Sequence, residues 1–392
     1  MKILFIHNRY QYRGGEDTTL ETEQALLESK GHQTKLLEFT NDDIHSLSSR
    51  ISAGLRSFYN PASARRLRED ITRFDPDVIH VHNLFFNASL SVLYQAANRH
   101  IPVVMTIQNY RFICANALLL RNNEVCELCI HKTLPLQGIR YKCYRNSIME
   151  SALVTGITST HKALHTLNKK LAGIIVPSHF LKNKLAHSSL KYPGDKIVVK
   201  PNFIDDVKAT HRPREDFFLF VGRLAKEKGI DTLLECFKCH PGRQLVIAGD
   251  GPEKESVMEA ARQYLNIRYI GLQPKEKILT LMETTKGLIF PSIWYEGLPL
   301  TIIEAFSRGT PVIASRLGAM SEMIVHDYNG LHFNPGDVKD LENCLEMFAR
   351  SDRKDLYTQA RKTYEDVYHP DIHYASIMGI YEKVINSKIG YV

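Results

Sequence analysis

The sequence predicts an α/β protein made of two doubly wound domains, and three observations lead to this fold class. Short β-branched runs alternate with amphipathic stretches along the chain, as in parallel sheets covered by helices. The alternation pauses at the polar, proline-containing segment 203–216 and then restarts. The length of 392 residues exceeds the roughly 100–200 residues of one ordinary domain.

We expect residues 1–203 together with 369–392 to form the N-terminal domain. Its strands are predicted at 2–7, 34–39, 77–82, 102–107, 173–178 and 196–202, and its helices at 16–30, 61–73, 88–99 and 147–170. An irregular stretch at about 111–146 reads as an insertion that contains cysteines.

We expect residues 204–368 to form the C-terminal domain, with strands at 217–222, 244–249, 267–271, 287–292 and 311–315. The segment 369–389 then has a helical pattern with one apolar face, formed by Tyr374, Ile377, Met378, Tyr381 and Val384. Because it follows the second sheet, this helix is expected to pack back across the domain junction.

Composition and charge narrow the classes of partner. Hydrophobic and charged contents of 44% and 24% are those of a globular protein. The net charge of +7 suits anionic lipid, phosphorylated ligands or nucleic acid, with a solvated basic surface as the alternative. We find no nucleic-acid-binding module and no apolar run of about 20 residues for a membrane span. Residues 1–11 read as a first strand and not as a signal peptide, so we expect a cytoplasmic protein whose seven cysteines are not a disulfide framework.

Ligands of doubly wound sheets collect beyond the carboxyl ends of the strands. Arg223 and Lys228 follow the strand at 217–222, and an arginine fork with a lysine charge suits a diphosphate. Gly14 and Gly15 stand between the first strand and the first helix, where backbone amides can approach an anion. Their spacing does not match the dinucleotide fingerprint GxGxxG, which argues against a dehydrogenase.

Two further segments follow strands of the second domain. Gly249 and Gly251 flank Asp250, either in an ordinary turn or in a ligand-binding loop. Glu296 and Glu304 occur in "EGLPLTIIE", where the proline leaves the amides of the first helical turn available to an anion. A carboxylate in apolar surroundings needs donors, and the vicinal hydroxyls of a sugar or ribose supply them. The alternatives are a helix-dipole partner for Glu296 and an ion pair for Glu304.

The spacing of these two glutamates resembles the EX7E motif of retaining glycosyltransferases of the family 4 type. "VGRLAKEKG", "IAGDGP", "EGLPLTIIEA", "GTPVIAS" and the early glycine pair follow in family order. The resemblance covers nearly the whole chain and implies a GT-B fold, with two facing Rossmann-like domains, a central cleft and a C-terminal helix that crosses back to the first domain.

The resemblance also implies roles for single residues. Arg223 and Lys228 would bind the donor diphosphate, Glu304 the ribose and Glu296 the donor sugar, and Glu296, Arg223 and Lys228 would be the catalytic residues. The remaining donor-binding positions would be Gly14, Gly15, Gly249, Gly251, Gly297, Leu298 and Leu300. No catalytic cofactor or metal is implied, and the nucleotide-sugar is a substrate. The Asp-x-Asp at 75–77 precedes its strand and is interpreted as a loop.

The acceptor side departs from the family pattern. Gln108 occupies a position where many relatives have a histidine, and because an amide cannot take a proton, it cannot be a general base. His82 ends the strand at 77–82 and is either an acceptor-side residue or a structural histidine.

Four cysteines in the insertion, Cys114, Cys126, Cys129 and Cys143, include a C-x2-C pair. They predict either a structural zinc site or four reduced thiols in a loop.

The sequence therefore predicts a retaining glycosyltransferase of the hexosyltransferase type that uses a nucleotide-sugar and a glycan or lipid-linked acceptor. The expected pathway is bacterial surface polysaccharide synthesis (lipopolysaccharide, O-antigen, capsule or exopolysaccharide) on the cytoplasmic face of the inner membrane, with peripheral contact to anionic lipid. The alternatives are a nucleotide-sugar epimerase and a non-catalytic nucleotide-sugar-binding subunit of a transferase complex.

Overall fold

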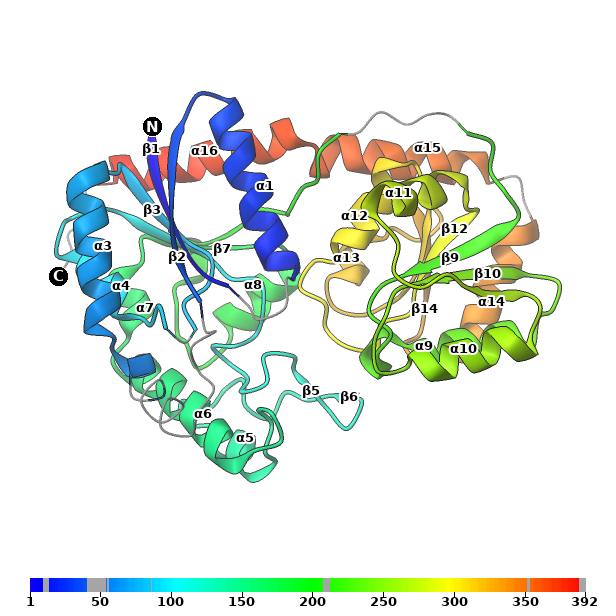
Figure 1. Ribbon diagram of the computed structural model, residues 1–392, viewed down its shortest axis with the longest axis horizontal. Helices are drawn as coiled ribbons and strands as arrows, with labels where there is room; N and C mark the ends of the chain where they lie inside the picture. The colour runs from blue at the N-terminus through cyan, green and yellow to red at the C-terminus, as the bar shows by residue number, and fades with distance from the viewer. Residues whose placement is uncertain are drawn as a thin grey trace. The chain divides into compact units, whose positions relative to one another are not determined.

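The computed structural model describes residues 1–9, 14–40, 54, 56–85, 87–206, 212–350 and 353–387. Its contacts divide the chain into two compact units (Figure 1). Unit 1 comprises Met1–Leu119, Glu127–Pro201 and His373–Val392, and unit 2 comprises Leu120–Cys126 and Asn202–Ile372. None of the helices in these described ranges combines the length and apolar character that crossing a bilayer requires.

Unit 1 contains a six-stranded parallel sheet in the order β2-β1-β3-β4-β7-β8. The strands are β1 (Lys2–Asn8), β2 (Gln33–Phe39), β3 (Val78–Val81), β4 (Val103–Thr106), β7 (Gly173–Val176) and β8 (Ile197–Val199). The helices are α1 (Gly15–Ser29), α3 (Pro61–Phe74), α4 (Ser91–Ala97), α5 (Leu136–Arg140), α6 (Ile148–Ala163), α7 (Thr166–Lys170) and α8 (His179–Ala186), with a 3-10 turn at Gly194–Lys196. Helices lie on both faces of the sheet (Figure 1).

Three parts of unit 1 differ from the sequence prediction, and one of them is α8, a helix that was not expected. The helix predicted at 147–170 is divided into α6 and α7, because His165 adopts a left-handed conformation with φ of 53°. The insertion contains α5 and, assigned by its contacts to unit 2, a short antiparallel hairpin of β5 (Leu120–Arg121) and β6 (Glu124–Val125). Neither has the periodicity from which the longer elements were predicted.

Unit 2 contains a second parallel sheet in the order β11-β10-β9-β12-β13-β14. Its strands are β9 (Phe217–Val221), β10 (Gln244–Ala248), β11 (Ile267–Tyr269), β12 (Gly287–Phe290), β13 (Val312–Ser315) and β14 (Gly330–Phe333). Its helices are α9 (Ile230–Lys238), α10 (Lys254–Gln263), α11 (Lys275–Thr284), α12 (Leu300–Ser307), α13 (Met320–Met323), α14 (Val338–Arg350) and α15 (Lys354–Thr363), with the 3-10 turn η2 (Lys226–Lys228) and the π-helical turn η3 (Tyr364–Tyr368). The prediction of two Rossmann-like domains is confirmed, with β14 as a strand that the sequence reading missed.

The last helix, α16 (Pro370–Asn386), begins in unit 2 and continues in unit 1. Ile377, Tyr381 and Val384 on its predicted apolar face are buried against Ile3 and Phe5 of β1. The expectation that the C-terminal helix packs on the first domain is therefore confirmed.

Candidate functional site

The strand order of unit 2 brings two predicted site segments to one place. β9 and β12 are neighbours in the sheet, although β10 and β11 lie between them in the chain. This is the point at which the strand order reverses, and open α/β sheets bind ligands beyond the strand ends at such a point. Arg223 and Lys228 follow β9, and Glu296 follows β12.

Glu296 lies in direct contact with Lys228. Its carboxylate is buried, and Lys228 Nζ lies 2.6 Å from Oε1. Ser292 Oγ donates to the same oxygen at 2.7 Å and Trp294 Nε1 at 2.9 Å. Among the described residues, none donates to the other oxygen, Oε2. One oxygen therefore fixes the carboxylate, while the second keeps its acceptor capacity.

Gly229 explains why Lys228 can come so close to the segment after β12. It has a left-handed φ of 71°, and a Cβ at this position would lie 1.9 Å from the carbonyl oxygen of Pro291. Ile293 N also donates to Glu227 O at 3.0 Å. Only a residue without a side chain permits this approach. The sequence reading did not single out Gly229, Ser292 or Trp294.

Gly249 and Gly251 support the loop that carries Arg223. A Cβ at Gly249 would lie 1.9 Å from Gly222 O, and one at Gly251 would lie 2.3 Å from Leu224 O. Both glycines therefore have a packing role, whichever of the two predicted functions they serve. The Arg223 side chain is exposed, and its guanidinium makes no hydrogen bond or ion pair with any residue that the structure describes.

Glu304 lies on α12, which begins after Pro299 at the N-cap. Burial raises the pKa of its carboxyl above the ordinary value, and the charge of Lys275 opposes this effect. Across the described ranges, no basic side chain forms an ion pair with Glu304, so the ion-pair alternative finds no support. Gly297, Leu298 and Leu300 lead into this helix and are half-buried.

In unit 1, Gly14 and Gly15 mark the start of α1. Gly14 is the N-cap, and its amide donates to Asp17 Oδ2 at 2.8 Å. The other oxygen of Asp17 lies 2.7 Å from His7 Nε2. Gly15 is the first helical residue and is exposed. The glycine pair thus lies beyond the end of β1, as the sequence predicts.

A buried ionic cluster is centred on Glu23 of α1. Glu23 Oε2 lies 2.6 Å from Lys200 Nζ and 2.8 Å from His373 Nε2, and its Oε1 lies 3.1 Å from His80 Nδ1. Burial alone would raise the pKa of Glu23, but Lys200 and His80, together with the hydrogen bond from His373, lower it well below its ordinary value. The cluster joins α1, β3, the end of β8 and α16.

His82 belongs to the surroundings of this cluster. It is buried, its Nε2 lies 3.5 Å from Glu23 Oε1, and its ring centroid lies 4.3 Å from that of His80. Burial lowers the pKa of His82 to about 4, with a further contribution from His80. These contacts favour the structural interpretation of His82. Gln108, the other predicted acceptor-side residue, follows β4 by two positions and is half-buried.

The predicted zinc ligands do not assemble. No group of three or more ligand atoms within 4.8 Å of one another includes Cys114, Cys126, Cys129 or Cys143, as far as the described residues extend. Burial raises the pKa of the Cys114 thiol, which disfavours the thiolate form that zinc requires. The spacing of the cysteines in the sequence does not determine the distances between their thiols in the folded insertion.

Two other groups have suitable ligand atoms at short range: Glu23 with His80 and His82, and Cys236 with His240 and Glu342. In the first, the Lys200 ammonium already neutralises the carboxylate. In the second, His240 Nδ1 lies 2.9 Å from the carbonyl oxygen of Cys236, and burial raises the pKa of that cysteine to about 12. Neither group is therefore assigned to a metal.

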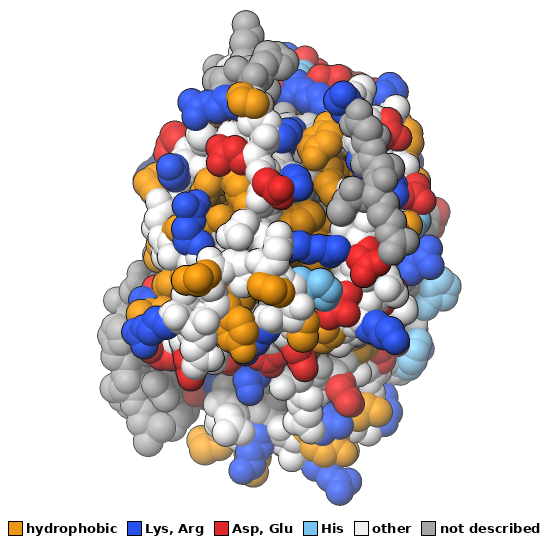
Figure 2. Space-filling model, turned by 90° about the vertical axis from the view of Figure 1, so that its right-hand side faces the viewer, with side chains coloured by type: hydrophobic (Ala, Val, Ile, Leu, Met, Phe, Trp, Pro, Cys, Tyr) orange, Lys and Arg blue, Asp and Glu red, His pale blue; other side chains and the backbone are white. Residues whose placement is uncertain are grey.

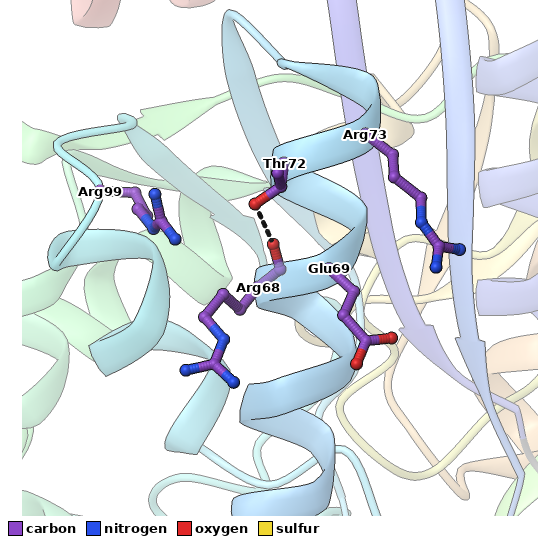
Figure 3. Close-up of a pocket in the computed structure, with 5 residues that line it drawn as sticks. All are labelled: Arg68, Glu69, Thr72, Arg73 and Arg99. Carbon is purple, nitrogen blue, oxygen red and sulfur yellow. Dashed lines mark hydrogen bonds between the residues drawn. The ribbon is translucent and has the colours of Figure 1, made fainter.

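A surface pocket of unit 1 lies away from every predicted site residue. Figure 3 shows its lining: Arg68, Glu69, Thr72 and Arg73 on α3, and Arg99 beyond the end of α4. Arg68 and Arg99 lie on one side of α3, and Glu69 and Arg73 on the other (Figure 3).

Comparison with known proteins gives a family match for each half of the chain. Residues 12–208 match glycosyltransferase family 4, and residues 203–363 match the glycosyl transferases group 1. A glycogen synthase of Mycobacterium tuberculosis is 31% identical over 158 residues, which are 37% of this chain and 38% of the relative. The O-antigen chain mannosyltransferase C of Escherichia coli is 25% identical over 216 residues, 51% of this chain and 58% of the relative. The chain thus spans less than two thirds of these relatives.

A solved structure supports the fold over the full length. HepE of Anabaena, solved in complex with UDP, aligns with a TM-score of 0.67 at 15% identity and covers 98% of this chain and 100% of its own. The match over residues 12–208, which is half of the chain, shows that this protein belongs to glycosyltransferase family 4.

Proposed function

We propose that this protein is a retaining glycosyltransferase that transfers a sugar from a nucleotide-sugar donor to a glycan or lipid-linked acceptor. The contact between Lys228 and Glu296 carries the proposal. Three donors hold Glu296 Oε1, and Oε2 is left to accept a hydroxyl of the donor sugar. A carboxylate fixed in this way positions a sugar without itself having to rotate, and such preorganisation favours catalysis.

The cations of this segment suit the departing diphosphate. The Lys228 ammonium has three N–H donors, of which the contact with Glu296 uses one, and the exposed Arg223 guanidinium adds a planar fork. Positive charge held where negative charge develops stabilises the transition state. These two residues supply that charge, and the proposal includes no catalytic metal.

Glu304 is proposed to hold the ribose. A carboxylate that is desolvated and lacks an ion pair needs hydrogen-bond donors, and two vicinal hydroxyls provide a pair of them. Binding of the ribose would then favour the ionised form of Glu304 and lower its raised pKa.

The proposed step is front-face attack with retention of configuration. The acceptor oxygen forms a bond to the anomeric carbon while the bond from that carbon to the diphosphate oxygen breaks, and the acceptor proton passes to the departing phosphate. Because Gln108 cannot accept a proton, the proposal assigns no general base to that position. Gly15 would contribute its backbone amide to the diphosphate or the acceptor, whereas the Gly14 amide already donates to Asp17 Oδ2, so that Gly14 would only let the ligand approach the backbone closely.

The acceptor is proposed to belong to bacterial surface polysaccharide synthesis at the cytoplasmic face of the membrane. The similarity to the Escherichia coli O-antigen chain mannosyltransferase supports this class of pathway.

Thermal unfolding in the presence of UDP-, GDP- and ADP-sugars tests the proposal, because a bound donor stabilises the folded state by mass action. We expect one nucleotide class to raise the melting temperature. With that donor and a panel of glycan and lipid-linked acceptors, NMR should show a product with the donor's anomeric configuration. An inverted product contradicts the mechanism, an epimer formed from the donor alone supports an epimerase, and nucleotide binding without turnover supports a binding subunit.

A further inference from the structure

The segment around α5 exposes apolar and basic side chains next to each other. Leu134, Leu136 and Tyr141 are 55%, 57% and 41% exposed, and Lys132, Arg140 and Lys142 are exposed among them. We call these six residues the α5 face. Single exposed apolar side chains are ordinary, but a cluster with a polar border usually marks an interaction site.

The exposure follows from how α5 packs. Gly138 is buried, and a Cβ there would lie 3.1 Å from Ala115 Cβ and 3.4 Å from Thr155 Oγ1 of α6. This close contact turns one side of α5 inward, and the α5 face is formed by side chains that remain outside. The packing of α5 at Gly138 therefore keeps these side chains exposed.

The charge of the α5 face is positive and uncompensated. No Asp or Glu occurs between residues 128 and 149, and the flanking Glu127 and Glu150 pair with Lys184 and Arg145. Lys132, Arg140 and Lys142 form no ion pair with any residue in the described ranges. On the face of the molecule drawn in Figure 2, basic and acidic side chains are interspersed.

We infer that the α5 face docks on the surface of an anionic lipid bilayer. Two leucines and a tyrosine suit the boundary between acyl chains and headgroups. Long basic side chains can extend to the phosphates while their methylene stems stay in apolar surroundings. The guanidinium of Arg140 lies 5.7 Å from the ring centroid of Tyr141, which keeps a cation beside an apolar group. Ile148 and Met149, exposed in the first turn of α6, extend the apolar surface along the chain.

The α5 face is a defined surface for the membrane contact that the proposed function includes, and on which this inference rests. The net charge of the chain did not identify such a surface. The pocket on α3 is also basic, but its lining contains no apolar side chain. A bilayer provides both kinds of contact, so the combination distinguishes the α5 face from a merely cationic surface. Docking here does not depend on catalysis by Glu296.

Vesicle co-sedimentation of the full chain tests the inference. Phosphatidylcholine vesicles are compared with vesicles that contain about one third phosphatidylglycerol. We expect the wild type to bind the anionic vesicles, and Leu134→Ser/Leu136→Ser and Arg140→Ser/Lys142→Ser each to reduce partitioning about tenfold or more. Arg68→Ser/Arg99→Ser removes two exposed cations elsewhere in unit 1 and should change partitioning less than about threefold.

Each other outcome is decisive. Failure of the wild type to prefer anionic vesicles overturns the inference, as does an equal loss in the α3 control, which would indicate general electrostatic attraction. Unchanged binding in both α5 variants, with unchanged melting temperatures, also overturns it. A wild-type dimer that the leucine variant converts to a monomer would instead identify the face as a contact between copies of the chain. Glu296→Gln should bind vesicles like the wild type, so a failed transferase proposal remains distinguishable.

Discussion

The ammonium group of Lys228 lies 2.6 Å from Glu296 Oε1, although β10, β11 and β12 lie between the two residues in the sequence. Neighbouring strands bring them together at the point where the strand order of unit 2 reverses. The contact brings a cation that suits phosphate next to a carboxylate that suits a hydroxyl. A nucleotide-sugar donor carries both phosphates and hydroxyls.

Replacing Gly229 should disturb both this contact and the stability of unit 2. In Gly229→Ala, the new methyl group would collide with Pro291 O at a backbone conformation that is unfavourable for alanine. We expect the free energy of unfolding to fall by roughly 1–3 kcal/mol and transfer to weaken. Gly242→Ala, where nothing lies within 4 Å, is the matched control and should change stability by less than about 0.5 kcal/mol in urea unfolding. Equal behaviour of the two variants would remove Gly229 from the account.

Breaking the buried pair of Glu23 and Lys200 should destabilise unit 1 strongly. Lys200→Met leaves a buried carboxylate without its principal cation, and such a loss costs about 3–5 kcal/mol. Adding Glu23→Gln should restore part of the stability, because the uncompensated charge is removed. Lys35→Met breaks the half-buried pair with Asp70, also 2.6 Å long, and should cost at most about 1 kcal/mol. Similar losses in the two single variants would show that burial does not govern the effect.

The same cluster predicts a loss of stability in acid. Burial lowers the pKa of His80 and His373, and that of His82 to about 4, while Glu23 and Lys200 face them with opposite charges. Below about pH 6.5 the unfolded chain binds protons that the folded cluster excludes, so stability is full above that pH and falls as the pH drops toward 4. For His82 alone, the loss between about pH 7.5 and 5 is on the order of 2 kcal/mol.

Denaturant unfolding at several pH values, followed by circular dichroism, measures this dependence. His82→Gln should flatten the slope of unfolding free energy against pH, but the remaining histidines should keep part of it. An unchanged slope in this variant, or a wild type that gains stability in acid, would contradict the assignment.

The elements that could be predicted from the sequence are those indicated by residues close together in the chain. Apolar runs placed the strands, and the position of Arg223, Lys228 and Glu296 after strand ends indicated the candidate site. Gly229 escaped notice because its partner, Pro291, follows a different strand, β12, and a glycine before a helix looks like any turn. Glu23 and Lys200 lie 177 positions apart, and each has ordinary polar neighbours in the sequence, so only the folded chain pairs them. For the four cysteines, the sequence left a zinc site and reduced thiols open, because spacing alone does not determine the distances between the thiols in the folded insertion.

Glu304 and Glu296 are proposed to hold different parts of the donor, and a parallel measurement on two variants tests this division of roles. The affinity for the free nucleoside diphosphate and the turnover with the intact donor are measured for Glu304→Ala and Glu296→Ala, with the exposed Glu276→Ala as the control. We predict that Glu304→Ala weakens nucleotide binding about tenfold or more, whereas Glu296→Ala lowers turnover about 100-fold and leaves nucleotide affinity within about twofold. Equal losses of affinity and turnover in both variants would contradict the account.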